Sequence, residues 1–450
     1  MSFRARILIV GGNSSDTAAL ADKLSAQSFD SVITEGPEEA LAVAEKRKSD
    51  IVIMLTGAET GKSDETGLDE TLALCHELTG GDPSGLPSVL LIGPPVGADK
   101  KARCFEAGVN AYLSPPYYEA QLFNRLHALV RLLTMREELE LRTETTRRFG
   151  VDEVAASFSA QDDNEPRILA IIRDTSDFAM MEEMLSHEMR LTYARSPDIA
   201  LDYLTRRPFD AVIINADGES EPWMLCSDIK NNSRLFSLPI LIVADHHDRQ
   251  SAEQPFRSGA NDVVFRPVQG LELESRVRAC VREARYRTAM HRIYREAKHF
   301  LTSDALTGLY SYGFALEHLA GVIEHAGEGR RNLTVGVFNV RHMAAVNAEH
   351  GYAAGDRLIR QIGNLIGTVI RGEDMAARIG GQEFCVILPD TDPEGARIVI
   401  DRIAGVVNST EYLVPGCDSQ MTIRLKSGST MFEPGDTPDK ILARARNNMK

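Results

Sequence analysis

The 450-residue sequence has a single tryptophan, only six cysteines and no long apolar run. The cysteines show no spacing typical of a metal site, so a reducing cytoplasm is the expected compartment. No stretch approaches the roughly 20 apolar residues that a membrane-spanning helix needs. The short apolar run in MSFRARILIVGG ends in two glycines instead of a cleavage site, which predicts a first buried strand. We therefore expect no membrane insertion.

An excess of positive charge is also missing. The formal net charge is -15, which disfavours non-specific binding of nucleic acid and of anionic membranes. An anionic ligand must therefore meet local arginines. The hydrophobic content of 43% with 26% charged residues is typical of soluble globular proteins. The length is enough for roughly three domains with a sizeable core in each.

The first 135 residues alternate short apolar runs with amphipathic segments, which predicts a parallel sheet with helices on both faces. The same order returns in a second copy that begins at RILAII (167–172) and continues with AVIIN (211–215), PILIV (239–243) and DVVF (262–265). Internal duplication of a doubly wound, flavodoxin-like domain explains the pattern. We predict α/β domains at 1–135 and 166–290, a helical extension and linker at 136–165, a helical linker at 291–303, and an α+β domain at 304–450.

Each copy ends in a helix with apolar residues at intervals of three and four. Charged extensions follow, ELELRTETTRR after the first copy and REARYRTAMHRIYREAKH after the second. One interpretation is an intramolecular packing face followed by a solvated linker; the other is a dimer seam. The residues concerned are Leu122, Leu126, Leu129 and Leu133 in the first copy, and Leu273, Val277, Val281 and Ala284 in the second.

From about Phe300 the pattern is that of an α+β domain. It predicts a helix after Leu309, a long helix from Asp356, and a helix through Ile398 and Ile403. The predicted strands are LTVGVFNV, the two arms of a turn around RIGGQEFCVIL, and a last strand near MTIRL.

The first repeat resembles a response-regulator receiver domain. That resemblance implies a pair of acids after the first strand, an acid after the third strand that takes a phosphoryl group, and a lysine after the fifth. Here those places carry Gly11 and Gly12, Leu55, and Pro115. Mg²⁺ prefers carboxylate oxygens and a phosphoacyl intermediate needs a carboxylate nucleophile, so we expect neither in this domain.

The second repeat also resembles a receiver domain and has lost most of the same groups. The corresponding places carry Arg173 and Asp174, Asn215, and Arg266. One of the three acids remains, and an asparagine is a poor nucleophile. A structural or partner-binding role is expected for both repeats, with phosphorylation near Asp174 as the alternative.

Three motifs of the last 150 residues resemble the diguanylate cyclase (GGDEF) family: DALTGL (304–309), RGED (371–374) and GGQEF (380–384). The resemblance implies a ferredoxin-like, cyclase-palm fold. The order receiver, receiver, cyclase resembles PleD-type response regulators. The pattern of losses resembles a catalytically degenerate paralogue of that architecture, which implies a cyclic di-GMP effector in bacterial cell-cycle control, localisation at a cell pole and delivery of a target to a regulated protease.

Family cyclases join two GTP molecules and hold two divalent ions with two acids, whose places here carry Asn339 and Gln382. An amide oxygen brings no negative charge to offset a dication beside a triphosphate. The family's lysine and arginine clasp on the triphosphate is missing, and Arg446 stands where that segment has an aspartate. Glu383 remains, but one acid does not rebuild a two-metal site. We expect no catalytic residue and no bound metal.

Ligand binding is predicted where the family binds its product. The resemblance implies that Arg371 and Asp374 of RGED bind cyclic di-GMP together with Arg402, and Arg378 either joins them or serves the hairpin. An arginine fork can donate two hydrogen bonds to the guanine edge and stack on a second base, while an aspartate accepts from the guanine N–H groups. The alternative for Arg371 and Asp374 is a surface ion pair at (i, i+3) spacing without a role in ligand binding.

The family's guanine readers in the active site correspond to Asn347 and Asp356, which could retain mononucleotide contacts. Both residues are also ordinary helix and helix-cap residues.

The leading hypothesis is a non-catalytic cyclic di-GMP effector, expected to be a homodimer that recruits proteins through its receiver-like domains. The alternatives are a weakly active diguanylate cyclase that converts two GTP to cyclic di-GMP, and a phosphorylation-driven switch.

Overall fold

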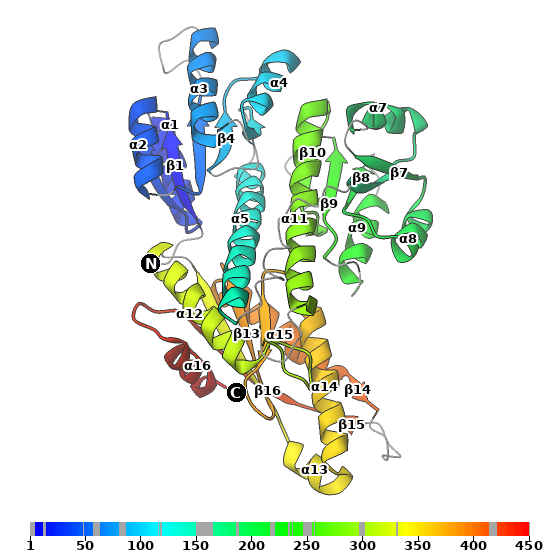
Figure 1. Ribbon diagram of the computed structural model, residues 1–450. Helices are drawn as coiled ribbons and strands as arrows, with labels where there is room; N and C mark the ends of the chain where they lie inside the picture. Colours follow the sequence, from blue (N-terminus) through cyan, green and yellow to red (C-terminus); the bar gives the residue numbers. More distant parts are fainter. Residues whose placement is uncertain are drawn as a thin grey trace. The chain divides into compact units, whose positions relative to one another are not determined.

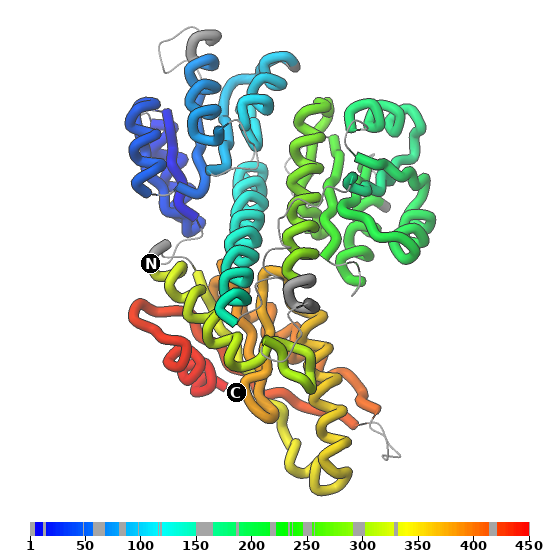
Figure 2. Tube along the Cα trace, in the orientation of Figure 1, coloured from blue at the N-terminus to red at the C-terminus, as the bar shows by residue number. Residues whose placement is uncertain are grey.

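The computed structural model describes residues 5–11, 15–47, 49–56, 64–80, 87–115, 117, 119–149, 165–185, 189–216, 221–232, 235, 237–245, 254–255, 257–296, 302–329, 332–413 and 421–449 (Figures 1 and 2). Gly12 and Cys417 lie outside them. The chain divides into two compact bodies. The N-terminal body comprises Phe3–Leu133 and Asp162–Arg285, and the C-terminal body comprises Thr134–Gln161 and Tyr286–Lys450. Among the helices of the described residues, none is long and apolar enough to cross a membrane.

The first α/β domain of the N-terminal body is built on a five-stranded parallel sheet of order β2-β1-β3-β4-β5. Its strands are β1 (Arg6–Val10), β2 (Asp30–Thr34), β3 (Ile51–Leu55), β4 (Ser88–Ile92) and β5 (Val109–Leu113). Its helices are α1 (Ser15–Ala26), α2 (Pro37–Arg47), α3 (Asp64–Thr79), α4 (Ala98–Glu106) and α5 (Glu119–Arg148). Apolar clusters cover both faces of the sheet, which explains why the strands are nearly continuous apolar runs.

The second α/β domain repeats this order as β7-β6-β8-β9-β10. Its strands are β6 (Arg167–Ile171), β7 (Arg190–Ala194), β8 (Ala211–Ala216), β9 (Ile240–Ala244) and β10 (Asp262–Phe265). Its helices include α7 (Thr175–Leu185), α8 (Pro197–Arg206), α9 (Glu221–Asn231) and α11 (Gly270–Glu296). Two parallel, doubly wound sheets with one strand order confirm the predicted fold class for this half of the chain.

The apolar stripes of α5 and α11 pack inside their own domains. Leu122, Leu126 and Leu129 are buried in the core of the first α/β domain. Leu273, Val277 and Val281 are buried in the core of the second. Of the two interpretations of the stripes, the intramolecular packing face is therefore the one that the structure bears out.

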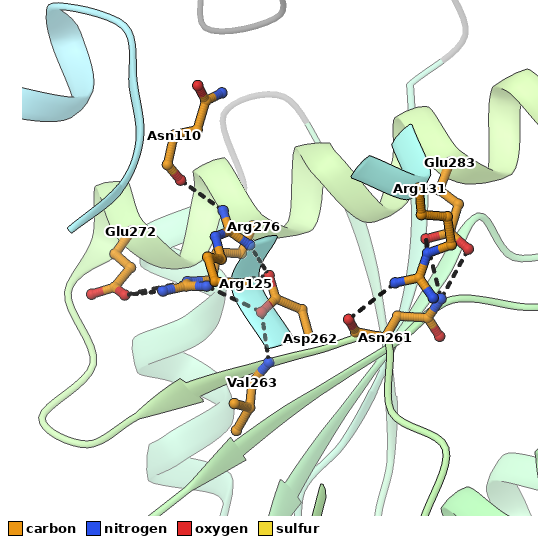
Figure 3. Close-up of polar contacts among 9 residues, drawn as sticks. All are labelled: Asn110, Arg125, Arg131, Asn261, Asp262, Val263, Glu272, Arg276 and Glu283. Atoms are coloured by element: carbon orange, nitrogen blue, oxygen red, sulfur yellow. Dashed lines mark hydrogen bonds and ion pairs between the residues drawn. The ribbon is translucent and has the colours of Figure 1, made fainter. Parts of the chain in front are cut away.

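The two α/β domains contact each other through a buried set of charges (Figure 3). Arg125 of α5 forms an ion pair with Asp262 at the start of β10, and Arg276 of α11 lies 3.1 Å from the same carboxylate. Arg276 also lies 2.8 Å from Glu272, whose second oxygen is 2.6 Å from Lys101 of α4. Burial alone would raise the pKa of Asp262, but Arg125 and Arg276 lower it. One carboxylate thus joins two arginines from equivalent helices.

A second contact lies alongside the first one. Arg131 of α5 lies 3.3 Å from the Glu283 carboxylate of α11 and donates to the Asn261 carbonyl at 3.3 Å. The Asn261 amide donates to both oxygens of Glu283, at 2.9 and 3.1 Å. These polar contacts join the two domains by directional bonds.

The C-terminal body contains a four-stranded antiparallel sheet of order β12-β13-β11-β16. The strands are β11 (Leu333–Val340), β12 (Met375–Arg378), β13 (Glu383–Pro389) and β16 (Leu425–Met431), with a separate pair of β14 (Glu411–Tyr412) and β15 (Met421–Thr422). The helices are α12 (Tyr312–Gly329), α13 (Met343–His350), α14 (Tyr352–Val369), α15 (Pro393–Ser409) and α16 (Pro438–Asn447). Apolar residues of α14 and α15 cover one face of the sheet, and those of α12 and α16 cover the other. This is the α+β arrangement that was expected.

Two element boundaries in this body differ from the sequence prediction. The long helix begins at Tyr352, four residues before Asp356, because Gly351 with φ of 82° makes the break that we assigned to an aspartate cap. The last strand of the main sheet is Leu425–Met431, while Met421 and Thr422 of MTIRL pair only with β14. The small and polar sequence KSGST concealed this strand, because it lacks a clear apolar alternation.

The extension of the first copy is not a solvated linker. In the α5 extension, which we define as Thr134–Arg148, four residues are at most 3% exposed: Glu138, Arg142, Thr145 and Thr146. These residues belong to the C-terminal body. The sequence prediction was wrong here because Glu138 and Arg142 pair with each other and with groups of this body instead of with water.

Candidate functional site

In the first α/β domain an apolar side chain fills the place where the resemblance to receiver domains implies acids. A Cβ atom at Gly11 would lie 2.8 Å from the Leu55 Cβ atom and 3.0 Å from its Cδ1 atom, so Leu55 packs directly over Gly11. No oxygen ligand for a divalent ion is supplied by either residue. The residues present do not fit a Mg²⁺ site.

In the second α/β domain the same edge of the sheet holds a closed polar cluster. The Arg266 Nη2 atom donates to Asn215 Oδ1 at 2.5 Å and to Asp177 Oδ2 at 3.0 Å. The Asn215 amide donates to the same Asp177 oxygen at 2.9 Å. Asp174 is engaged separately, since its Oδ1 atom accepts from the Ser176 amide at 2.9 Å, which lowers its pKa. Arg266 also lies 3.5 Å from the Asp245 carboxylate, so one arginine pairs with both carboxylates of this cluster.

The positions of the cyclase metal ligands form another self-contained cluster. Asn339 of β11 is paired with Glu383 of β13 in the sheet register, and its Nδ2 atom lies 3.4 Å from Glu383 Oε1. The Gln382 amide donates to Asn339 Oδ1 at 3.3 Å. Arg446 of α16 lies 3.2 Å from Glu383 Oε2. One carboxylate, two amides and a guanidinium do not fit a pair of divalent cations.

The two predicted guanine contacts lie on successive helices. Asn347 is on α13, and its Oδ1 atom is buried without a hydrogen-bond partner among the described residues. A Cβ atom at Gly355 would lie 1.9 Å from that oxygen, so α14 can approach it only because this residue is glycine. Asp356 follows on α14 and is exposed. A buried acceptor without a donor is costly, which is consistent with a contact that a ligand completes.

The RGED segment forms a tight turn before β12. The Arg371 backbone N–H donates to Asp374 Oδ2 at 2.9 Å. Asp374 is only 4% exposed, whereas Arg371 is exposed. Among the described residues no group bonds the second carboxylate oxygen of Asp374. The turn thus presents an arginine beside a carboxylate that keeps one open acceptor.

Arg402 of α15 lies close enough to this turn to share its electrostatics. Burial and the neighbouring Glu373 raise the pKa of Asp374 to about 6, while Arg371 and Arg402 oppose the shift. Partial burial and Arg371 lower the pKa of Arg402. Neither guanidinium forms a hydrogen bond or ion pair with a described residue. Within the described part of the chain, Arg371, Asp374 and Arg402 thus share one electrostatic environment, and both guanidinium groups keep their hydrogen-bond donors open.

Arg378 of β12 is engaged elsewhere. Its guanidinium donates to the carbonyls of Gly380 and Gly381 at 3.1 and 2.7 Å, and to the Asp304 carboxylate at 3.1 and 3.2 Å. It therefore ties the glycine hairpin to the DALTGL segment. A contact of Arg378 with cyclic di-GMP stays a prediction.

Sequence reasoning missed a group of buried residues behind the RGED turn. Arg142 of the α5 extension donates to the carbonyls of Glu373 and Asp374. It also pairs with Glu138, which in turn contacts His318 of α12. The (i, i+4) spacing of Glu138 and Arg142 was the available signal, but such pairs are usually solvated.

Comparison with known proteins assigns the C-terminal domain. Residues 301–450 match the family model of the diguanylate cyclase, GGDEF domain. The chain is 26% identical over 447 residues to the response regulator PleD of Caulobacter vibrioides, which covers 98% of this chain and 95% of PleD. It is 26% identical over 215 residues to the diguanylate cyclase DgcP of Pseudomonas aeruginosa, which covers 48% of this chain and 30% of DgcP.

Among solved structures, the GGDEF domain of DgcB from Caulobacter crescentus in complex with c-di-GMP is 26% identical, with a TM-score of 0.32. The match covers 33% of this chain and 85% of that one. The C-terminal domain is thus a GGDEF domain, and the chain as a whole is similar to a PleD-like response regulator.

Proposed function

We propose that the protein is a non-catalytic cyclic di-GMP effector that binds the dinucleotide at Arg371, Asp374 and Arg402. The observation that carries this proposal is the pair of guanidinium groups that form no hydrogen bond or ion pair with any described residue, beside the nearly buried Asp374. Cyclic di-GMP is a dianion whose guanine edges offer acceptors to arginine and N–H donors to a carboxylate. The match of residues 301–450 to the diguanylate cyclase family model supports the ligand class.

The former catalytic site supports an effector in preference to an enzyme. Catalysis of phosphoryl transfer depends on metal ions that neutralise developing charge. Asn339 and Gln382 are amides, and Arg446 lies 3.2 Å from the remaining Glu383. This cluster has no net negative charge to attract a divalent cation, whereas an active cyclase must bind two.

Replacing Arg371 by alanine should weaken cyclic di-GMP binding roughly 10- to 100-fold, because one bidentate arginine contact is worth about 1–3 kcal/mol. The measurement is calorimetric titration of the full chain, for which we expect low-micromolar affinity. Arg397→Ala is the matched control, since Arg397 is an exposed arginine on the same helix as Arg402. An unchanged dissociation constant in Arg371→Ala would refute the site assignment.

Binding should also depend on the protonation of Asp374. Its pKa of about 6 means that the carboxylate is ionised above this pH and takes up a proton below it. The guanine N–H groups need the ionised acceptor, so affinity should fall roughly tenfold for each pH unit below that pKa. Calorimetry between about pH 7.5 and pH 5 tests this result, and Asp374→Asn should flatten the profile. An affinity that stays constant over this range in the wild type would contradict a role for the Asp374 carboxylate.

A second candidate function is a weakly active diguanylate cyclase. It is favoured by the retained Glu383 and by the match to the cyclase family model. Asn347 and the exposed Asp356 would then contact GTP at the former active site. Separate titrations with GTP and with cyclic di-GMP distinguish the two functions, since the effector function requires only the latter to bind tightly.

The α/β domains supply the output of the proposed effector. Their former phosphorylation sites are filled by Leu55 in one domain and by the Arg266 cluster in the other. We propose that they serve as docking surfaces for protein partners and in a homodimer, with the cell pole and regulated proteolysis as the context. Size measurement in solution with and without cyclic di-GMP tests the dimer.

A further inference from the structure

A buried arginine outside the RGED motif holds the backbone of the RGED turn. The Arg142 Nη2 atom donates to the Glu373 carbonyl at 3.0 Å and to the Asp374 carbonyl at 2.9 Å. Arg142 is 3% exposed, and both residues that carry these carbonyls are nearly buried. Two adjacent carbonyls bound by one charged donor cannot rotate independently, because each would lose a charge-assisted hydrogen bond. The contact therefore fixes the two peptide units that flank the Asp374 Cα atom.

A carboxylate behind Arg142 fixes the arginine itself. The Arg142 Nε atom donates to Glu138 Oε1 at 2.7 Å, and His318 Nε2 lies 2.9 Å from the same oxygen. Burial alone would raise the pKa of Glu138, but His318 and Arg142 lower it to about 2. Arg142 also lies over the Tyr310 ring, 5.9 Å from its centroid. Arg142 cannot swing away from the turn without leaving the Glu138 charge buried and poorly paired.

A second helix, α11, also packs against this turn. A Cβ atom at Gly372 would lie 2.7 Å from the Arg287 Cγ atom, so the Arg287 stem rests on the glycine of RGED. Glycine at this position permits the close approach. The turn is thus supported on its protein side by Arg142 and Arg287, while Arg371 is exposed on its other side.

We propose that Arg142 is a positioning residue of the dinucleotide site, which holds the RGED turn so that Arg371 and Asp374 can contact the ligand together. The inference rests on the proposed function. Arg142 itself touches no ligand, since it is buried against the turn's backbone. Its contribution is to order the turn before the ligand arrives, so that binding does not carry the entropic cost of ordering it.

The test uses the full chain with Arg142→Met and Arg142→Lys. Methionine keeps the apolar stem but has no donor, and lysine keeps the charge beside Glu138 but replaces the planar fork by one ammonium group. Arg136→Met is the matched control, because Arg136 lies on the same helix in an exposed ion pair with Glu140, 3.1 Å long. Calorimetry with cyclic di-GMP and hydrogen exchange of the ligand-free 371–375 segment are measured for each variant.

We expect roughly tenfold weaker binding for Arg142→Met, equivalent to about 1.4 kcal/mol. Exchange of the 371–375 amides should be faster in the ligand-free protein, because the turn opens more often. Arg142→Lys should recover part of both losses, and Arg136→Met should match the wild type. A purely structural role would not give partial rescue in both readouts at once.

Wild-type binding and wild-type exchange in Arg142→Met would overturn the inference while leaving the proposed function intact. Weaker binding without faster exchange of the turn would also overturn it. If Arg142→Met does not fold, Arg142→Lys carries the same test, with a roughly threefold loss of affinity expected. If the wild-type protein does not bind cyclic di-GMP, both the proposed function and this inference are wrong. Titration of the wild type alone reveals that outcome.

Discussion

Replacing Asp262 by alanine should lower the free energy of unfolding of the second α/β domain by about 3–5 kcal/mol. Asp262 is 5% exposed, and it pairs with Arg125, which is 4% exposed, and with Arg276, which is 6% exposed. Without the carboxylate, two buried guanidinium groups would face each other. Burial and the neighbouring Arg276 already lower the pKa of Arg125 to about 10 in the intact cluster, which indicates how poorly this site tolerates unpaired positive charge.

The single tryptophan makes this measurement direct. Trp223 lies on α9 and packs against the core of the second α/β domain, so its fluorescence during urea unfolding reports on that domain. Asp202→Ala is the control, because Asp202 forms an exposed (i, i+4) pair with Arg206 in the same domain and should cost less than about 1 kcal/mol. An unfolding midpoint for Asp262→Ala equal to that of the control would show that the cluster contributes little.

A combined variant separates charge from packing. Replacing Arg125 and Arg276 by methionine together with Asp262→Ala removes the whole set of central charges. Buried ion pairs replaced by apolar groups of similar size are often neutral, whereas a broken pair is costly. The triple variant should therefore be more stable than Asp262→Ala alone. A triple variant that is less stable would mean that the arginine contacts with Asn110 and Glu272 outweigh the repulsion.

The fold was predictable where strands are buried on both faces. Continuous apolar runs such as RILIV and AVIIN identify parallel strands, because helices cover both sides of the sheet. The strand Leu425–Met431 was misplaced because only two of its residues, Leu425 and Gly428, are buried. Its sequence, LKSGSTM, contains the polar and small residues that are typical of loops. This segment is a strand because its backbone pairs with β11, and such a long-range contact leaves no signal in the local sequence.

In the candidate site, only the residues that belong to recognisable motifs could be predicted from the sequence. RGED and GGQEF placed Arg371 and Asp374 because the two motifs stand at a fixed spacing in the chain. Arg142 was not predictable, since its partners are backbone carbonyls more than two hundred residues away in the sequence. Arg125 and Arg276 could have been found, because each is the seventh residue of an equivalent helix in the duplicated domain. An alignment of the two copies reveals these equivalent arginines, whereas the amino-acid composition does not.

The purified chain should form no cyclic di-GMP from GTP with either Mg²⁺ or Mn²⁺. The two lost carboxylates and the adjacent Arg446 remove the charge that metal ions need, and metal ions supply most of the transition-state stabilisation in phosphoryl transfer. We expect turnover to be lower than that of an active cyclase by several orders of magnitude. Chromatography of products from labelled GTP measures this, and turnover that disappears in Glu383→Ala would establish the cyclase instead.

Restoring the charges tests the physical reason for the missing turnover. The variant Asn339→Asp, Gln382→Asp and Arg446→Ala places three carboxylates where the structure has one, 3.2 Å from a guanidinium. Mn²⁺ binding, measured by electron paramagnetic resonance, should become at least roughly tenfold tighter than in the wild type, because each acid adds a charged oxygen ligand. A variant with wild-type Mn²⁺ affinity would mean that the geometry of the strands, and not the lost charge, excludes the metal.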